Sequence, residues 1–306
     1  MSAVQVASAL RDALSQALVG KREVVELTVA AVLAGGHVLV EDSPGVGKTL
    51  LAKSLARAIG GSAGRIQGTA DLLPTDITGV TVFDQGTSAW KFRPGPLFAN
   101  VVLVDEINRA TPRAQSALLE AMAERQVTAD GTTYRVPDPF VVIATQNPLG
   151  DVGTFPLGDG QRDRFAVRLT IGLPDRATER GLLLGEGGEP QLALLTPVIT
   201  PAQLSAVQAE VAALHLSAPV ADYLLDVVTA LRAHPSLALG PSPRASLVLG
   251  RVARAIAVLA GRNFVAPDDV QRAAPVVLAH RVVALGNRSG EAAVADALGQ
   301  VRVPVG

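Results

Sequence analysis

Apolar residues in the first 174 positions occur in short runs that alternate with longer segments of mixed polarity. Four of these runs are apolar along most of their length, as expected of strands buried on both faces of a parallel sheet. They cover residues 37–41, 101–105, 140–145 and 165–171. Helices are predicted at 4–18, 21–34, 49–59 and 112–125. This alternation of strands and helices predicts an α/β domain with a parallel sheet.

Two β-hairpins are predicted within the same region. β-rich pieces at 80–83 and 90–92 flank a turn that contains glycine, which is typical of a hairpin. The second hairpin lies within residues 126–136 and surrounds Asp130-Gly131, a strong signal for a two-residue turn.

The pattern changes after Pro174, because only helical segments follow, separated by breaks rich in glycine and proline. A chain of 306 residues also has the size at which one hydrophobic core tends to split into two. We therefore predict two domains, an α/β domain over residues 1–174 and an all-helical domain over residues 175–306.

A glycine-rich loop follows the first predicted strand. The segment Glu41-Asp-Ser-Pro-Gly-Val-Gly-Lys-Thr49 lies between a strand and a helix and has the spacing of a Walker A loop. Backbone N–H groups of such a loop, together with the positive end of the helix dipole, bind phosphates. We expect Lys48 to reach the β- and γ-phosphates of ATP and Thr49 to bind Mg²⁺. The predicted nucleotide contacts of this loop are Pro44, Gly45, Val46, Gly47, Lys48, Thr49 and Leu50.

Asp42 departs from the strict Walker A pattern, which has glycine at this position. Aspartate tolerates left-handed backbone better than most residues, so the loop can still form. Its carboxylate would repel the phosphates unless it is turned away from them. We expect the substitution Asp42→Gly to leave ATPase activity unchanged or to raise it.

Two acids end the apolar run 101–105, as in a Walker B motif. Successive side chains diverge at the end of a strand, so Asp105 can serve the Mg²⁺ shell while Glu106 polarises the attacking water. The run 140–145 also ends in polar residues, and the amide of Asn147 can orient that water. Asparagine before proline is a common turn initiator as well, so Asn147 alone is a weak signal.

Composition limits the classes of function. The net charge is −1, so no overall field attracts nucleic acid or an anionic membrane. Cysteine is absent, and the four histidines lack the spacing of metal ligands. No uncharged segment is long enough to span a bilayer, and charges interrupt the N-terminal segment where a signal peptide is apolar. We expect a soluble cytoplasmic protein with neither membrane insertion nor a nucleic-acid partner.

The motifs resemble those of the MoxR family of AAA+ ATPases along nearly the whole chain. The matching segments are Leu18-Val-Gly20, 35–39, 44–53, 71–79, 92–98, Asp105-Glu-Ile-Asn-Arg-Ala110, 115–122, 124–127, Ala144-Thr-Gln-Asn-Pro148 and 264–270. The resemblance implies an AAA+ P-loop NTPase core with a five-stranded parallel sheet, followed by an all-helical lid domain. It also implies that the chain is an enzyme, an ATP hydrolase that uses Mg²⁺.

Further site residues follow from the resemblance alone. Val19 and Gly20 are expected to border the adenine, Asn147 to act as sensor 1 and Arg244 as sensor 2. Arg164 is similar to the arginine finger, which reaches the γ-phosphate of a neighbouring subunit, and a planar cation suits that role. Arg162 offers a second candidate for the finger, because the family usually has leucine there.

The family resemblance also indicates what ATP hydrolysis is for. The two hairpins match insertions that line the axial face of a homo-oligomeric ring, most often a hexamer. Relatives are associated with chaperone-like remodelling or maturation of partner complexes, often proteins with a von Willebrand factor A domain. Three alternatives stay open: the ATPase subunit of a metal chelatase, a nucleic-acid motor and a non-hydrolysing nucleotide switch. The near-neutral charge disfavours the motor, and the combination of Glu106, Asn147 and Arg164 disfavours the switch.

Overall fold

A five-stranded parallel sheet lies at the centre of the computed structural model, which describes residues 1–43, 45–147, 153–286 and 288–304. The strand order is β2-β5-β8-β1-β9. The bounds are β1 Val38–Glu41, β2 Ala63–Gln67, β5 Val101–Asp105, β8 Val141–Gln146 and β9 Val167–Leu169. The predicted parallel sheet of five strands is therefore confirmed. The strand β2 was not predicted, and β9 is shorter than the predicted 165–171.

Alternate residues of the central strands enter two separate hydrophobic clusters. Val101 and Leu103 of β5 pack into one cluster, whereas Val102 and Val104 pack into the other. Side chains of a strand point alternately to its two faces, which explains this division. Because both faces of the sheet are covered, the central runs are apolar throughout.

Helices from both ends of the chain cover one face of the sheet. The helices α1 (Ala3–Ala17), α2 (Arg22–Leu33) and α3 (Lys48–Ala58) share the first cluster with the C-terminal helices. The helix α5 (Pro112–Glu124) packs into the second cluster. Its N-terminus is capped by the hydroxyl of Thr111, which accepts a hydrogen bond from the N–H of Ala114.

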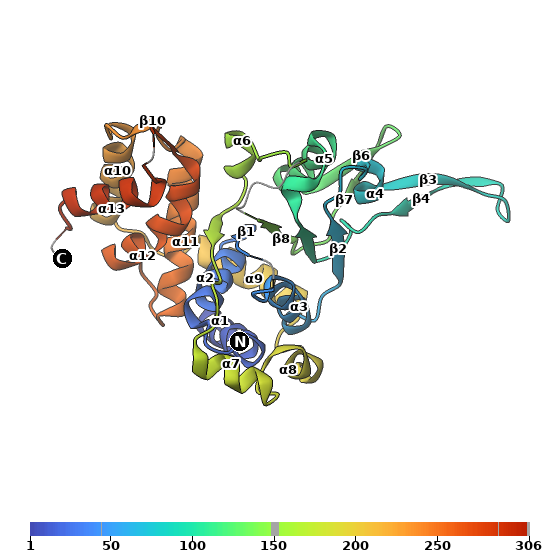
Figure 1. Cartoon of the computed structure of the whole chain (residues 1–306), viewed down its shortest axis with the longest axis horizontal. Helices are drawn as coiled ribbons and strands as arrows, with labels where there is room; N and C mark the ends of the chain where they lie inside the picture. Colours follow the sequence, from blue (N-terminus) through green and yellow to red (C-terminus); the bar gives the residue numbers. More distant parts are fainter. Residues whose placement is uncertain (44, 148–152, 287, 305–306) are drawn as a thin grey trace.

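Two hairpins extend from the α/β region, as predicted. The first consists of β3 (Gly79–Asp84) and β4 (Ala89–Pro94), preceded by α4 (Pro74–Thr78), and it projects far from the sheet (Figure 1). The second consists of β6 (Gln126–Ala129) and β7 (Thr132–Arg135). Its turn residues Asp130 and Gly131 have φ of 48° and 75°, the left-handed backbone of a two-residue turn.

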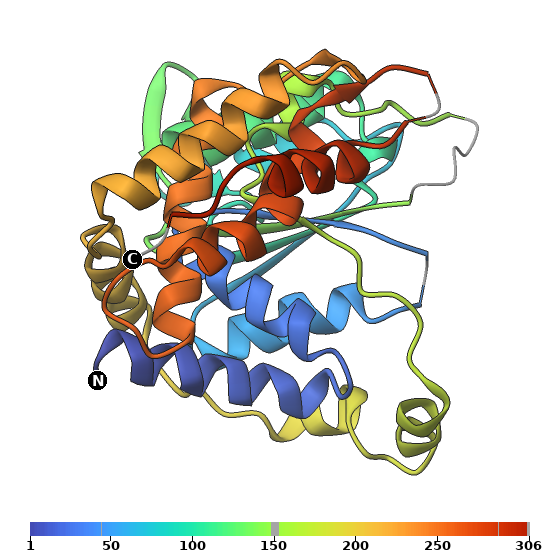
Figure 2. The same ribbon diagram turned by 90° about the vertical axis from the view of Figure 1, so that its left-hand side faces the viewer.

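Most of the remaining chain is helical. Its helices are α6 Asp159–Arg162, α7 Arg176–Leu183, α8 Gly188–Leu194, α9 Pro201–Ala212, α10 Ala218–Arg232, α11 Pro243–Leu259, α12 Pro267–Leu278 and α13 Gly290–Gln300. Two 3₁₀ turns are η1 Ile107–Arg109 and η2 Ala279–Arg281. The last helices gather on the side of the sheet away from the long hairpin, and they lie in front of the sheet in Figure 2.

The expectation of helices alone after residue 174 was wrong in one detail. The short strands β10 (Leu237–Leu239) and β11 (Val283–Ala284) form a small antiparallel sheet. Runs of two and three residues are too short to show strand periodicity, so they carried no signal. In addition, α8 packs against α1 and α3, and α9 packs against α1 and α2. The chain after Pro174 therefore first covers the α/β region with α8 and α9. It then forms a helical group that consists of α10, α11, α12 and α13.

Candidate nucleotide site

The glycine-rich loop joins β1 to α3 at the carboxyl edge of the sheet. Gly45 and Gly47 have φ of 84° and 102°, a left-handed backbone that only glycine adopts readily. Gly47 is the N-cap of α3 and offers no side chain to the free N–H groups of the first turn, so these groups can bind an anion. Pro44 lies outside the described residues.

Lys48 is the first residue of α3 and lies at the centre of the predicted site. Its Nζ donates a hydrogen bond to the backbone oxygen of Asp42 at 2.6 Å. Burial lowers the pKa of the Lys48 ammonium, and three carboxylates oppose this shift, those of Asp42, Asp105 and Glu106. The Walker A lysine and the Walker B acids therefore lie close enough to interact.

Both oxygens of the Asp42 carboxylate accept hydrogen bonds from backbone N–H groups. One oxygen accepts the N–H of Ser43 at 2.7 Å, and the other accepts the N–H of Gly172 at 2.6 Å. Asp42 thus ties the loop to the segment that follows β9. Lys21 holds the same segment, since its Nζ donates to the carbonyl oxygens of residues 171, 172 and 173, each at 2.8 Å.

A cavity of about 410 Å³ opens beside this loop. Loop residues 45–50 line it together with residues 17–19 and Lys21, so Val19, which is expected to border the adenine, lines the same cavity as the loop. Gly20 packs against Thr178, which itself lines the cavity. The remaining wall was not predicted and comes from the α7–α8 segment, with Pro174, Thr178, Leu182, Gly188 and Glu189. No local sequence pattern marks these residues.

The Walker B acids end β5, next to β8. The Glu106 backbone has φ of 55°, and its N–H donates to the hydroxyl of Thr145 at 3.0 Å. Glu106 therefore follows the strand in a left-handed backbone conformation, and the predicted division of roles between Asp105 and Glu106 stays a prediction. Asp105 and Thr49 offer a carboxylate and a hydroxyl oxygen, the hard ligands that Mg²⁺ prefers, so these residues fit the proposed metal.

The edge strand β2 supplies partners for both acids. Arg65 forms an ion pair with Asp105 at 3.0 Å, and the Gln67 amide donates to Glu106 at 3.1 Å. Arg109 donates to the same Glu106 oxygen, also at 3.1 Å. Arg65 and Gln67 were missed because the identity of the strand beside β5 could not be read from the sequence. Arg109 lies within the matched segment 105–110, but no role was assigned to it.

Asn147 directly follows β8 and is half-buried. The strand β8 lies between β5 and β1, with Gln146 opposite Glu41 in the register. Because the strands are parallel, Asn147 lies at the same sheet edge as the Walker B acids and the loop.

Arg164 and Arg244 lie together at a different cavity of about 350 Å³. None of the described residues lines both this arginine cavity and the nucleotide cavity. Arg125 and Arg251 also line the arginine cavity, and among the described lining residues only Asp163 is acidic. Within the described chain, Arg164 Nε is a buried nitrogen without a hydrogen-bond partner. Arg162 Nε is likewise buried without a hydrogen-bond partner among the described residues, but another nitrogen of Arg162 pairs with Asp159, and Arg162 is not among the described lining residues.

His37 lines the arginine cavity in its neutral form. Burial, assisted by the charge of Arg125, lowers its pKa to about 3. Its Nδ1 accepts the N–H of Val142 at 3.0 Å, which requires an unprotonated nitrogen. The positive charge of this cavity therefore comes from arginine.

Asp163 joins the two segments that carry the arginines. Its carboxylate accepts from Arg281 Nε at 2.8 Å and from the hydroxyl of Ser242, the N-cap of α11, at 3.3 Å. Arg281 also donates to backbone oxygens of residues 163, 165 and 166. Burial lowers the pKa of Arg281 to about 10, although its hydrogen bond to Asp163 opposes that shift. The helical group therefore holds Arg164 and Arg244 at one site.

Comparisons with known proteins agree with this arrangement. The family model described as "ATPase family associated with various cellular activities (AAA)" matches residues 37–167, and the AAA lid domain model matches residues 229–298. The Bacillus subtilis protein YeaC is 43% identical over 297 residues, which are 95% of this chain and 93% of YeaC. The Mycobacterium tuberculosis protein named Chaperone MoxR1 is 41% identical, over 87% of this chain and 72% of its own length.

A solved structure has the same fold. A crystal structure of a protein from Cytophaga hutchinsonii superposes with a TM-score of 0.90 at 30% identity, over 99% of this chain and 96% of that one. In the described ranges, every helix is too short or too polar to cross a membrane. With relatives of this similarity over most of its length, the chain belongs to the MoxR family of AAA+ ATPases.

Proposed function

We propose that this protein binds ATP with Mg²⁺, hydrolyses it, and uses the cycle to remodel or mature partner protein complexes. The observation that carries the proposal is the strand order, in which only β8 separates β1, which leads into the loop and Lys48, from β5, which ends in Asp105 next to Glu106. A phosphate cradle alone would support binding. An acid beside the cradle adds the group that hydrolysis requires.

Each residue has a role in this proposal. The loop N–H groups and Lys48 hold the phosphates, while Thr49 and Asp105 hold Mg²⁺, which would neutralise charge on the phosphoryl group. Glu106 polarises the attacking water and Asn147 orients it. Gln67 and Arg109 both donate hydrogen bonds to one carboxylate oxygen of Glu106, so the other oxygen can face a water.

Arg164 and Arg244 act on the nucleotide of a neighbouring copy in this proposal. Their cavity is separate from the nucleotide cavity of the same chain, and it is rich in arginine. The position of Arg164 in the lining of this cavity supports Arg164 as the finger. Arg162 is not among the described lining residues and forms an ion pair with Asp159, which argues against Arg162. A head-to-tail contact of this kind closes into a ring, and we propose a hexamer on the family resemblance.

The remodelling role rests on the relatives, one of which is named a chaperone. We propose a protein client or partner, with a von Willebrand factor A domain as the first kind to test. Hydrolysis is preferred to a simple nucleotide switch because Glu106 and Asn147 lie at the same sheet edge as the loop.

The test separates binding from turnover. We expect Lys48→Ala to abolish ATP binding in calorimetry, because the variant lacks the cation placed for the β- and γ-phosphates. Glu106→Gln should bind ATP and lose phosphate release. Lys91→Ala, on the hairpin, is the matched control and should keep both. Tight stoichiometric ATP binding by the Lys48 variant would contradict the assignment.

A further inference from the structure

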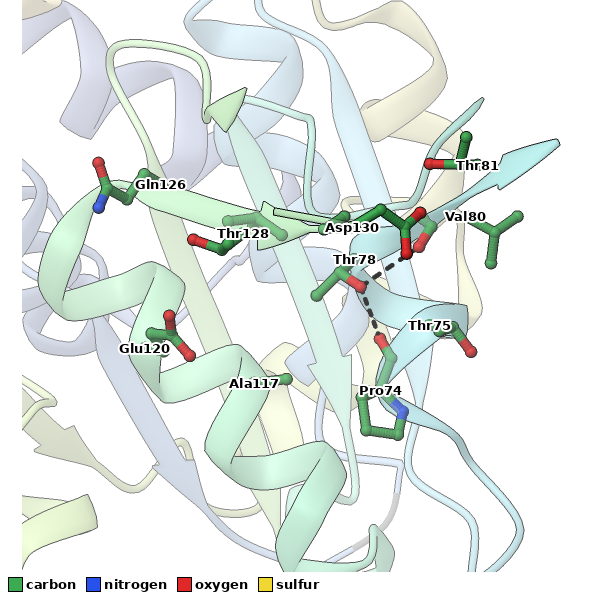
Figure 3. Close-up of a pocket in the computed structure, with 13 residues that line it drawn as sticks. Pro74, Thr75, Thr78, Val80, Thr81, Ala117, Glu120, Gln126, Thr128 and Asp130 are labelled. Carbon is green, nitrogen blue, oxygen red and sulfur yellow. Dashed lines mark hydrogen bonds between the residues drawn. The ribbon is translucent and has the colours of Figure 1, made fainter. Parts of the chain in front are cut away.

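A second large cavity, of about 460 Å³, lies away from the nucleotide. Figure 3 shows it between the helix α5, the strand β6 and the segment that runs from α4 into β3. Its volume is in the range of ligand-binding pockets, roughly 300–1,000 Å³. None of the Walker, sensor or finger residues lines it.

The cavity runs along the edges of two strands. All four residues of β6, 126–129, line it, and so do residues 79–81 of β3. Successive side chains of a strand point to opposite faces, so a cavity bordered by consecutive residues follows the edge of the strand. The partner strands β4 and β7 contribute no lining residue, which places them on the far side of each hairpin.

These edges have main-chain groups without partners. In the described part of the chain, the backbone groups of Val80, Thr81 and residues 126–129 make no backbone hydrogen bond outside their own hairpins. The two-residue turn makes Ala129 and Thr132 the hydrogen-bonded pair next to it. Pairs alternate along the ladder, so Thr128 directs its N–H and C=O away from β7 and toward the cavity.

The side chains around the cavity are hydroxylic and acidic. Hydroxyls come from Thr75, Thr78, Thr81 and Thr128, and carboxylates come from Glu120 and Asp130. Lysine and arginine are absent from the described lining. Native edges are usually blocked by lysine, proline or a covering segment, and residues 79–81 and 126–129 contain neither lysine nor proline. An open, acidic edge of this kind suits an extended chain that carries positive charge.

We propose that this cavity binds an extended, basic segment of a client polypeptide, which hydrogen-bonds along the edge of β6. The identity of the client as a remodelled protein rests on the proposed function, but the binding itself does not require ATP. Main-chain pairing gives affinity without a defined sequence, and Glu120 and Asp130 select lysine or arginine side chains. The strand β3 continues beyond the cavity to Phe83, which contacts Trp90 edge-on at 5.4 Å between ring centroids and can pack on the flanking client residues.

The test uses fluorescein-labelled peptides of alternating valine with lysine or with glutamate, and fluorescence anisotropy without nucleotide. We expect the lysine peptide to bind and the glutamate peptide to bind at least about tenfold more weakly, because unlike charges attract in the cavity. Thr128→Pro removes one N–H that faces the cavity and should weaken binding about tenfold.

Thr133→Pro is the matched control, because Thr133 is the cross-strand neighbour of Thr128 on the edge that does not line the cavity. It should bind like the wild type. Replacing both acids, Glu120→Gln with Asp130→Asn, should reduce the preference for lysine, whereas Glu210→Gln on α9 should not.

Three results would overturn the proposal: no binding of either peptide, equal weakening by the two proline variants, or a preference for the glutamate peptide. These outcomes are independent of the ATPase assignment, which Lys48→Ala tests separately. Peptide binding by a protein that fails to hydrolyse ATP would refute the proposed enzyme and retain this site.

Discussion

The nucleotide cavity and the arginine cavity are built in different ways. The first includes one continuous lining segment, residues 45–50, which contains two glycines with left-handed backbone. The second collects side chains from segments around His37, Arg125, Arg164 and Arg244. The conformation of the phosphate-binding loop is specified by local sequence. The arginine cluster forms only when the helical group packs against the α/β region.

One aspartate ties each region together. Asp42 joins the loop to Gly172 within the α/β region, and Asp163 joins the segment of Arg164 to the helical group through Arg281 and Ser242. If the two cavities have separate functions, loss of the Asp42 hydrogen bonds should affect ATP binding. Loss of the Asp163 interactions should affect turnover.

The largest effect is expected from Arg164→Ala. We expect ATP binding to persist while turnover falls, by up to the roughly 10³–10⁵-fold that arginine fingers supply. Mixing this variant with inactive Lys48→Ala should restore partial activity, because some interfaces then pair an intact nucleotide cavity with an intact finger. Phosphate release from the mixture is the measurement. A mixture that stays inactive although mixed oligomers form, or a wild type equally active as a dilute monomer, would disprove action between subunits.

An intermediate effect is expected from Asp163→Asn. The side chain of Arg281 is 1% exposed, and it would lose the negative charge that partners it. Breaking a buried ion pair costs up to about 3–5 kcal/mol in the free energy of unfolding. We expect this loss in chemical denaturation, with ATP binding retained and turnover reduced. Asp159→Asn, which breaks the more exposed pair with Arg162, should cost less than about 1 kcal/mol. If Asp163→Asn and Asp159→Asn lower the free energy of unfolding by the same amount, the pair of Asp163 with Arg281 has no special role in stability.

The smallest effect is expected from Asp42→Gly. The sequence alone suggested unchanged or higher ATPase activity, but the hydrogen bond from Gly172 gives Asp42 a positive role. Loss of a hydrogen bond to a charged group costs about 1.5–3 kcal/mol. We therefore expect lower stability and weaker ATP binding, measured by denaturation and calorimetry, with Asp42→Asn in between. Unchanged ATP affinity in Asp42→Gly would restore the simpler view that the carboxylate is only tolerated.

Much of the fold was predictable because its central strands are buried on both faces. The runs at β5 and β8 are apolar along nearly all of their length, and the strong turn signal of Asp130-Gly131 located the second hairpin. The edge strand β2 was missed because only Ile66 is buried in it, and Gly64 and Arg65 weaken the strand pattern. Edge strands depend on pairing with a neighbour, which one sequence does not reveal.

The site was predictable to the extent that its chemistry is local. The loop and the Walker B acids are contiguous motifs, and each lies at the sheet edge where the motifs place it. Gln67 and Arg65 reach the acids only through strand order, and Thr178 reaches the nucleotide cavity only through the path of the chain after β9. That Arg164 and Arg244 share a cavity follows from the docking of η2 and α11, which no local pattern encodes.

The long hairpin also gives the protein a built-in optical reporter. Trp90 is the only tryptophan in the chain. It is 71% exposed on β4 and belongs to neither hydrophobic cluster. Its emission therefore reports on the surroundings of the hairpin and responds little to loosening of the core. A shift of this emission to shorter wavelength would signal that the hairpin has been covered, and unfolding of the body is better followed by circular dichroism.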